Sequence, residues 1–275
     1  LCVLILMLME HSEVTIKILR WNWLSQHVLG RWIMRFGSNM QILVQVKQLA
    51  TRLAVFLCDA FFPVECVTCG ARDWWLCEAC RLKIVWQTEQ VCPICRVTSA
   101  GGATCEACPS ELDGVLVLAH YDGVLKKAIR AYKYNFAREL GEELAEMLAV
   151  FFLEQSHFAA ELLIVPVPLA AGRLHWRGFN QAEILGAAIA RLNSSELNSV
   201  DLIKHKETLA QAKLSLDERL ESLDDCFVWQ GADLRSRTVM VVDDVMTTGR
   251  TLEAVASVLR AAGAREVWGV VLARG

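Results

Sequence analysis

The chain has 275 residues, of which 54% are hydrophobic and 21% are charged, and its formal net charge is −3 at pH 7. This length suits one domain of about 160 to 170 residues that buries a full core, together with a smaller module. The near balance of charge excludes a global preference for nucleic acid or for a membrane surface, so that only local patches can serve such partners.

Residues 1–39 are predicted to lie upstream of the natural start, at Met40, or to be disordered. They begin with nine apolar residues in a row. That run is too short to span a membrane and lacks the basic leader and the cleavage site of a signal peptide, so we expect no integral membrane segment. The alternative is a peripheral helix that contacts a membrane or a partner through Trp21, Trp23 and Trp32.

Residues 40–110 are predicted to form a helix followed by a cysteine-rich module. Apolar residues recur at helical spacing from Leu43 to Leu57. Four Cys-x2-Cys pairs then follow within 43 residues, and they are Cys66 with Cys69, Cys77 with Cys80, Cys92 with Cys95, and Cys105 with Cys108.

Each such pair can present two thiolates to one tetrahedral ion, so the four pairs can hold two closed Zn²⁺ sites. Because a closed four-thiolate site leaves no coordination position open, structural zinc is predicted. A disulfide framework needs an oxidising compartment, and no convincing secretory segment supports one. A redox or metal-storage role is a third interpretation. The short gaps leave open whether the pairs combine in sequence order or crosswise.

Residues 111–275 are predicted to form one α/β domain. Its first elements are a strand at 115–119, an amphipathic helix at 122–133, a second helix at 138–152, and a buried strand at 162–168 that is ended by prolines.

The first of these helices carries basic residues beside its apolar face. They could follow the backbone of a nucleic acid, with Tyr134 and Phe136 stacking on bases. They could equally form an ordinary solvated surface. The candidate nucleic-acid-binding residues are Lys126, Lys127, Arg130 and Lys133.

A polar and cationic turn at 173–181 is predicted before a helix at 182–192. Arginines there, such as Arg177, could hold a diphosphate in bidentate fashion. The alternative is a surface loop capped by Asn180. Short strands at 202–203 and 227–229, with a charged helix at 214–223 between them, follow.

Residues 239–251 combine a buried strand, two carboxylates and a loop that opens a helix. Residues 239–242 are apolar and mostly β-branched, which suits a strand covered on both faces, and helical periodicity runs from Thr251 to a stop at Gly263. The loop amides converge near the positive end of the helix, where an anion is favoured. Gly249 permits close backbone approach. A ribose-5-phosphate site is therefore predicted.

In this site the loop would hold the phosphate, while Asp243 and Asp244 accept hydrogen bonds from sugar hydroxyls or help to hold Mg²⁺. The alternative is an ordinary strand and turn, in which the acids are merely solvated and the threonines cap a helix.

A last buried strand is predicted at 267–273. Strands near 115, 162, 202, 239 and 267 that alternate with helices predict a doubly wound parallel sheet. Ligands of such sheets bind at the carboxyl ends of the strands, where the loop after Asp244 lies.

The segment 239–251 resembles the diphosphosugar-binding signature of type I phosphoribosyltransferases, whose ligand is 5-phosphoribosyl 1-diphosphate (PRPP). The resemblance implies that Asp243 and Asp244 bind the ribose hydroxyls and that the loop binds the 5-phosphate. Arg250 stands where many members have Gly or Ala. The implied PRPP-binding residues are Asp243, Asp244, Val245, Met246, Thr247, Thr248, Gly249, Arg250 and Thr251, with Arg177 as a candidate for the diphosphate.

The order of motifs over residues 56–275 resembles the competence protein F family, that is, ComFC and GntX-like proteins. The likeness is carried by the cysteine pairs, Tyr121-Asp122-Gly123, Lys133-Tyr134, Pro166-Val167-Pro168, Arg177-Gly178-Phe179-Asn180-Gln181, Thr208 with Gln211, Leu214-Ser215 before Glu218-Arg219, and the segment 239–251. Ser222 departs from the family, which often has Asn there, and residues 1–39 have no counterpart.

This resemblance implies a cytoplasmic protein with an amino-terminal zinc-ribbon module and a phosphoribosyltransferase-type domain, linked to the uptake or use of external DNA. As a transferase it would use Mg²⁺ with PRPP, and Asp243 and Asp244 would be catalytic, because they would steady the sugar as positive charge develops at C1. No residue identifies the acceptor. The alternative is a non-catalytic module that binds single-stranded DNA, works with DNA-uptake proteins and uses PRPP as an effector.

Overall fold

A parallel sheet of five strands forms the centre of the molecule, in the order β1-β7-β6-β2-β3. Its strands are β1 (Gly114–His120), β2 (Leu163–Pro166), β3 (Glu196–Leu197), β6 (Thr238–Met246) and β7 (Glu266–Arg274). All four pairings in this sheet are parallel, which confirms the predicted α/β class. The central strands β6 and β7 are buried along most of their length, which is why they read as continuous apolar runs.

The structure is a computed structural model that describes residues 64–134, 138–155, 158, 162–205 and 226–275. The expectations for residues 1–39, for the helix that leads to Leu57, for Phe136 and for the segment 206–225 lie outside these residues. Both cysteine clusters and the sheet belong to one compact unit, Glu65–Gly275.

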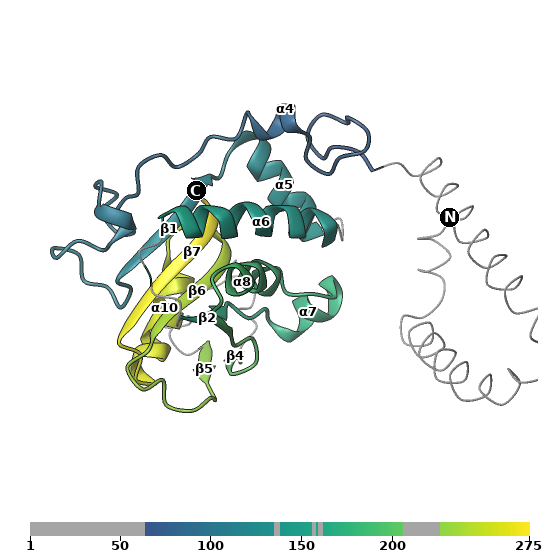
Figure 1. Cartoon of the computed structure of the whole chain (residues 1–275). Helices are drawn as coiled ribbons and strands as arrows, with labels where there is room; N and C mark the ends of the chain where they lie inside the picture. The colour runs from purple at the N-terminus through teal and green to yellow at the C-terminus, as the bar shows by residue number, and fades with distance from the viewer. Residues whose placement is uncertain (1–63, 135–137, 156–157, 159–161, 206–225) are drawn as a thin grey trace, which may run out of the picture. The chain divides into compact units, whose positions relative to one another are not determined.

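Helices cover both faces of the sheet (Figure 1). On one face lie α5 (Gly123–Tyr134), α6 (Arg138–Gln155) and α8 (Gln181–Leu192), and on the other lies α10 (Arg250–Ala261). Side chains of β6 alternate between the two cores, since Met240 and Val242 join the first and Val239 and Val241 the second. The same alternation decides which face each aspartate of β6 meets.

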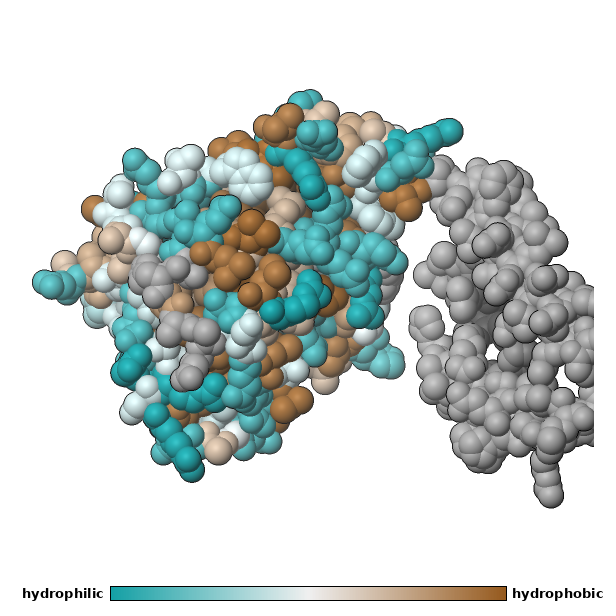
Figure 2. Space-filling model, viewed as in Figure 1, coloured by the Kyte–Doolittle hydropathy of each residue, from teal (hydrophilic) through white to brown (hydrophobic). Residues whose placement is uncertain are grey.

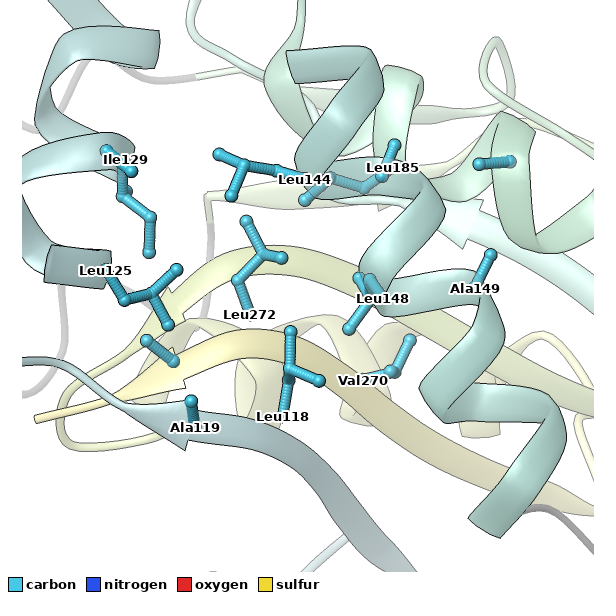
Figure 3. Packing of buried hydrophobic residues seen from close by; sticks show 14 of the residues in the cluster. Leu118, Ala119, Leu125, Ile129, Leu144, Leu148, Ala149, Leu185, Val270 and Leu272 are labelled. Carbon is cyan, nitrogen blue, oxygen red and sulfur yellow. The ribbon is translucent and has the colours of Figure 1, made fainter. Parts of the chain in front are cut away.

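Aliphatic side chains make up the core under the three helices (Figure 3). Leu144 and Leu148 of α6 lie over Leu272 and Val270 of β7, with Leu125 of α5 alongside, and all five are fully buried. Burying one such side chain contributes roughly 1.5–3 kcal/mol, so this core fixes α5 and α8 against the strands and thereby places their ends.

Two local predictions need correction. The strand at 202–203 forms as β4 (Leu202–Lys204), but it pairs antiparallel with β5 (Phe227–Trp229) in a separate hairpin. Parallel neighbours need a crossover of about a dozen residues, and only a few separate β4 from β3. Asn198 turns the chain in this gap, since its side-chain oxygen accepts hydrogen bonds from the amides of Val200 and Asp201 at 3.2 and 3.0 Å.

The second correction concerns the predicted turn at 173–181, much of which is helical. Helix α7 (Ala171–Arg177) ends at Gly178, whose φ of 77° permits the left-handed cap. The amide of Gly178 donates to the carbonyl of Leu174 at 2.8 Å, which closes the last turn.

The segment after the first cysteine cluster covers the free edge of β1. Trp86 pairs antiparallel with Ala119, and the amide of Gln87 donates to the carbonyl of Leu118 at 3.0 Å. The buried side chain of Gln90 continues this pairing, because it accepts from the amide of Val117 at 2.9 Å and donates to the carbonyl of the same residue at 3.0 Å. The edge strand is thus capped by the cysteine-containing segment.

A cavity of about 550 Å³ lies between this segment and α6, lined in part by Trp86, Glu143, Val150 and Phe151. Figure 2 shows hydrophobic residues gathered on the same side of the molecule, over α6. None of the cavity's lining residues belongs to β6 or to the loop after it, so the cavity is separate from the sheet's carboxyl edge. Within the described ranges, no helix combines the length and the apolar character needed to cross a bilayer.

Candidate functional site

Asp243 and Asp244 lie within β6, which runs on to Met246, and not after its end. They are paired with β7 on a buried strand, so their backbones are held rigidly and their side chains point to opposite faces of the sheet. Asp244 is 8% exposed and Asp243 is half-buried. The amide of Asp244 donates to Oδ1 of Asp243 at 2.8 Å.

Asp244 forms an ion pair with Lys133, the penultimate residue of α5. The Lys133 Nζ lies 2.6 Å from Oδ1 of Asp244, and 22% and 11% of the two side chains are exposed. Packing of the preceding residue holds the end of α5, since the hydroxyl of Tyr132 donates to the carbonyl of Gln181 at 3.1 Å and its ring stacks on Phe179. Burial, and then the charge of Asp244, raise the pKa of Tyr132.

Asp243 faces the hairpin β4–β5. Its burial, with the like charge of Asp244, raises its pKa to about 7, although the amide of Asp244 and the cations Lys133 and Lys204 act in the opposite direction. Lys204 is held in β4 with its Nζ 4.9 Å from the ring centroid of Phe227. Burial, and then Arg173, lower the pKa of Lys204. A titratable carboxyl and a half-buried ammonium therefore share this edge of the sheet.

The loop after β6 ends at Gly249, which is the N-cap residue of α10 and has a φ of 80°. No side chain caps this helix, so the alternative in which threonines serve as caps does not hold for α10. The first amides of a helix lack partners within it, and here the loop leads straight into them. Thr247, Thr248 and Arg250 are exposed around this positive end. The arrangement can receive an anion.

Arg177, the candidate for the diphosphate, is the last residue of α7. It is 8% exposed, and its Nη1 donates to Oε1 of Gln181 at 2.7 Å. Its guanidinium lies 5.7 Å from the ring centroid of Tyr134. These contacts hold Arg177, at the end of α7, against α8 and against the end of α5. Asn180 caps α8 by accepting from the amide of Ala182 at 3.2 Å, as the alternative prediction had it.

The candidate basic surface of α5 divides in two. Lys126, Lys127 and Arg130 are exposed, whereas Lys133 turns toward Asp244. A cavity of about 460 Å³ lies beside the exposed cations, lined by Val67, Lys127, Arg130, Ala131 and Tyr134. Next to it, the rings of Tyr134 and Trp176 lie 6.2 Å apart, and each side chain is 55% exposed.

The cysteines form two clusters, in sequence order, which answers the question that their spacing left open. The sets are Cys66, Cys69, Cys77 and Cys80, and then Cys92, Cys95, Cys105 and Cys108, with the sulfurs of each set within 4.8 Å of one another. Their S···S separations include 3.5, 3.6 and 3.3 Å. Four sulfurs about 2.3 Å from one Zn²⁺ stand about 3.8 Å apart, whereas a disulfide is about 2.05 Å long.

In each cluster a backbone amide points at one cysteine sulfur. The amide of Cys77 points at the sulfur of Cys66 and that of Cys105 at the sulfur of Cys92, each at 3.5 Å. Burial opposes ionisation of Cys66 and Cys92, but the contacts with backbone amides outweigh it and lower the pKa of each thiol to about 6. In the same clusters, burial and then the neighbouring sulfurs raise the pKa of Cys80, and the sulfur of Cys105 and then burial raise the pKa of Cys108. The arrangement of four sulfurs in each cluster is thus compatible with structural zinc, and one thiol of each set ionises readily to the thiolate that binds the metal.

The contacts of several residues had no clear signal in the sequence. Lys133 shares helical spacing with the exposed cations, and only its place in the last turn of α5 separates it from them. Lys204 follows two apolar residues in a short strand and shows no motif. The role of Gln90 was also not predicted, because a hydrophobic pattern does not indicate that a side-chain amide will form hydrogen bonds with the backbone of an edge strand.

Comparisons with known proteins agree with this architecture. A family model described as a phosphoribosyl transferase domain matches residues 186–275. The chain is 29% identical to competence protein F of Haemophilus influenzae over 72% of this chain and 96% of that protein. It is 28% identical to DNA utilization protein YhgH of Escherichia coli K12, over 70% and 95% of the two chains. It is 27% identical to competence protein ComFC of Bacillus subtilis, over 73% and 86%.

Among solved structures, 49% of this chain matches 62% of a hypoxanthine phosphoribosyltransferase from Staphylococcus aureus, at 11% identity and a TM-score of 0.32. The fold assignment rests on the parallel sheet and its helices instead. Two four-cysteine clusters precede the matched domain in the chain. The chain is therefore similar to competence protein F and ComFC over most of its length, and its two cysteine clusters, which are compatible with zinc ribbons, precede a segment that matches a phosphoribosyl transferase domain.

Proposed function

We propose that this protein binds PRPP at the carboxyl edge of its sheet. The observation that carries the proposal is the path of β6, which holds Asp243 and Asp244 rigidly and then passes through a loop into the positive end of α10. The 5-phosphate would occupy the loop from Thr247 to Thr251, and the ribose hydroxyls would reach the two carboxylates. Val245 and Met246, which lie between the two aspartates and the loop, would complete the contact with PRPP.

Charge balance gives each side chain a role in this proposal. A diphosphate next to two carboxylates is repulsive, and Mg²⁺, when bound with PRPP, would supply the positive charge that bridges them. Lys133 already neutralises Asp244, and Lys204 approaches Asp243 from the hairpin. Asp243 must be ionised to accept both ribose hydroxyls strongly, so its raised pKa makes binding sensitive to pH near neutrality.

Transfer of the ribose-5-phosphate group is the second part of the proposal. As diphosphate leaves, positive charge develops at C1 of the sugar, and fixed carboxylates close by stabilise that charge. Asp243 and Asp244 would do this from a strand that does not reorganise during reaction. A screen of candidate bases would identify the acceptor of this group.

Isothermal titration with PRPP and Mg²⁺ tests the binding proposal. The wild type should bind, and Asp243→Asn should abolish binding while native mass spectrometry still finds two zinc ions per chain. Glu266→Gln is a matched control, because Glu266 is the first residue of β7 and lies at the amino-terminal end of the strands, away from the proposed site. Unchanged affinity in Asp243→Asn would exclude the assigned role.

A second candidate function is favoured by the ring pair of Tyr134 and Trp176 beside the cations of α5. Exposed rings next to a basic cavity are what a single-stranded nucleic acid needs for stacking and for backbone contact. In this alternative PRPP is an effector, and the partners are single-stranded DNA and the proteins of its uptake.

Two measurements separate these functions. Release of diphosphate on supplying candidate bases supports the transferase. Binding of single-stranded DNA that weakens steeply with salt, and that Lys126→Ala, Arg130→Ala and Trp176→Ala each reduce, supports the DNA-binding module. The proposal also includes zinc as the metal of both clusters. The cluster cysteines form no disulfides, and because free thiols are maintained in a reducing compartment, the proposed location is the cytoplasm.

A further inference from the structure

Arg274 connects the second cysteine cluster to the start of the loop after β6. It ends β7, where it stands in register with Met246, the last residue of β6. The amide of the next residue, Gly275, donates to the carbonyl of Met246 at 3.0 Å. On the other side of β7, the carbonyl of Arg274 accepts from the amide of Tyr121 at 2.7 Å. The end of β7 therefore holds the residue at which the loop begins.

The side chain of Arg274 points to the cysteine cluster. Its Nη2 donates to the carbonyl of Pro93 at 2.6 Å, and Pro93 lies between the ligand candidates Cys92 and Cys95. Its Nε and Nη1 are buried and have no hydrogen-bond partner among the residues that the structure describes. Arg96, next to Cys95, reaches back to the carbonyl of Gly275 at 3.4 Å. The two parts are thus joined by contacts in both directions.

Electrostatic attraction explains why arginine side chains lie next to the second cysteine cluster. One Zn²⁺ with four thiolates carries a net charge of about −2, which a neighbouring guanidinium offsets. Burial lowers the pKa of Arg274, as does Arg96, while the Cys92 thiolate acts in the opposite direction. The two buried N–H groups that lack a partner among the described residues are costly, and a neighbouring anionic cluster offsets part of that cost.

We propose that Arg274 is a positioning residue through which metal in the second cluster orders the sugar-phosphate loop. A closed cluster keeps the Pro93 carbonyl against the Arg274 side chain, and the backbone of Arg274 and Gly275 holds Met246. When the metal leaves, the cluster opens, the guanidinium loses the Pro93 carbonyl, and the loop from Thr247 to Thr251 loosens. The effect on ligand affinity rests on the proposed function, whereas the effect on the loop does not.

Hydrogen exchange of residues 247–251, followed by mass spectrometry on the zinc-loaded full chain, tests the link without any ligand. Cys108→Ser, which opens the second cluster, should speed exchange of the loop about tenfold, an ordinary coupling between two sites. Cys69→Ser, which opens the first cluster, should leave the loop unchanged. Arg274→Met should match Cys108→Ser with both zinc ions retained, and Arg274→Lys, which keeps one charged donor, should recover part of the protection.

Arg265→Met is the control for loss of an arginine beside β7, because Arg265 lies immediately before the first residue of that strand, at the end opposite to Arg274. Equal loop exchange in Arg274→Met and Arg265→Met would overturn the proposal, as would equal effects of Cys108→Ser and Cys69→Ser. If Arg274→Met does not fold, Arg274→Gln takes its place, and loop exchange equal to that of the wild type in zinc-loaded Arg274→Gln would overturn the role of Arg274.

PRPP gives the reciprocal measurement. It should slow the loss of one of two zinc ions to a chelator in the wild type, and should not do so in Arg274→Met, since coupling between two sites acts in both directions. Absence of PRPP binding to the wild type would count against the proposed function, while the loop-exchange result would still decide the role of Arg274. PRPP binding that has no effect on zinc release would overturn the coupling itself.

Discussion

Lys133 and Asp244 form an ion pair between the end of α5 and the carboxyl half of β6, with 2.6 Å between Nζ and Oδ1. The pair brings together two residues that the sequence places in different motifs, one in a basic helix and one in a segment that resembles a diphosphosugar-binding signature. It also neutralises one of two adjacent carboxylates, which lets both stay in a partly buried strand.

The first prediction concerns the stability that this pair contributes. Exposed pairs contribute about 0–1 kcal/mol, and breaking a buried pair costs about 3–5 kcal/mol. With 22% and 11% of the side chains exposed, we expect Lys133→Met to lower the free energy of unfolding by about 1–2 kcal/mol. Urea denaturation at pH 7 measures it. Lys127→Met, at an exposed position of the same helix, should be nearly neutral, and equal stability of the two variants would contradict the prediction.

A second prediction is that Asp243→Asn gains stability while losing ligand. The folded pKa of about 7 lies above the usual 3.8, so the folded state keeps a proton between these values that the unfolded state has lost. The stability of the wild type therefore falls as pH rises from about 4 to 7, and the loss is complete above 7. Asparagine carries no charge and escapes this cost.

Thermal unfolding at several pH values measures this difference. The melting temperature of Asp243→Asn should exceed that of the wild type at pH 8, by at least about 2 °C, and the excess should shrink toward pH 5. A variant that is less stable than the wild type at pH 8 would mean that Asp243 is held ionised by its neighbours.

A third prediction concerns Gly249. Its φ of 80° lies in the left-handed region, and a Cβ there would meet the Cε of Met246 at 3.0 Å. Gly249→Ala should destabilise the protein by about 1–2 kcal/mol and also weaken PRPP binding, because the strain falls on the proposed phosphate loop.

Gly70 offers a matched control, since its φ is 77° and no atom lies within 4 Å of its Cβ position. Gly70→Ala should cost similar stability in chemical denaturation and leave the affinity for PRPP unchanged. If both variants bind PRPP as the wild type does, the loop does not hold the phosphate.

A fourth prediction uses zinc stoichiometry to test the order of the cysteine clusters. Cys69 and Cys77 belong to different Cys-x2-Cys pairs but to the same cluster. The double variant Cys69→Ser with Cys77→Ser should therefore keep one zinc ion in native mass spectrometry. Any crosswise combination of the pairs would damage both sites at once, and loss of both ions would contradict the structure.

Much of the fold was predictable because its signals are local. Alternating or continuous apolar runs gave β1, β2, β6 and β7, and helical spacing gave α5, α6, α8 and α10. The start of α10 at Gly249 and its stop before Gly263 follow from the freedom of glycine at positive φ. The cysteine spacing likewise indicated tetrahedral metal sites from a few residues each.

Predictions were wrong where one local sequence pattern is compatible with more than one tertiary arrangement. The apolar residues of β4 suit a parallel sheet or a hairpin, and the short connection after β3 decides for the hairpin. The residues around Arg177 suit a turn or a helix, and the cap at Gly178 decides for α7. In each case the deciding contact involves a turn residue whose effect the hydrophobic pattern does not contain.

The sequence by itself determined the class of this protein, since strand and helix periods, cysteine pairs and the Asp-Asp loop are properties of neighbouring residues. Only the tertiary structure decided that the cysteine pairs combine in order, that Lys133 meets Asp244, and that Arg274 joins the second cluster to the loop. These contacts link residues that are far apart in the chain. They depend on which strand edges and helix ends come together when the core packs, and no local pattern records that.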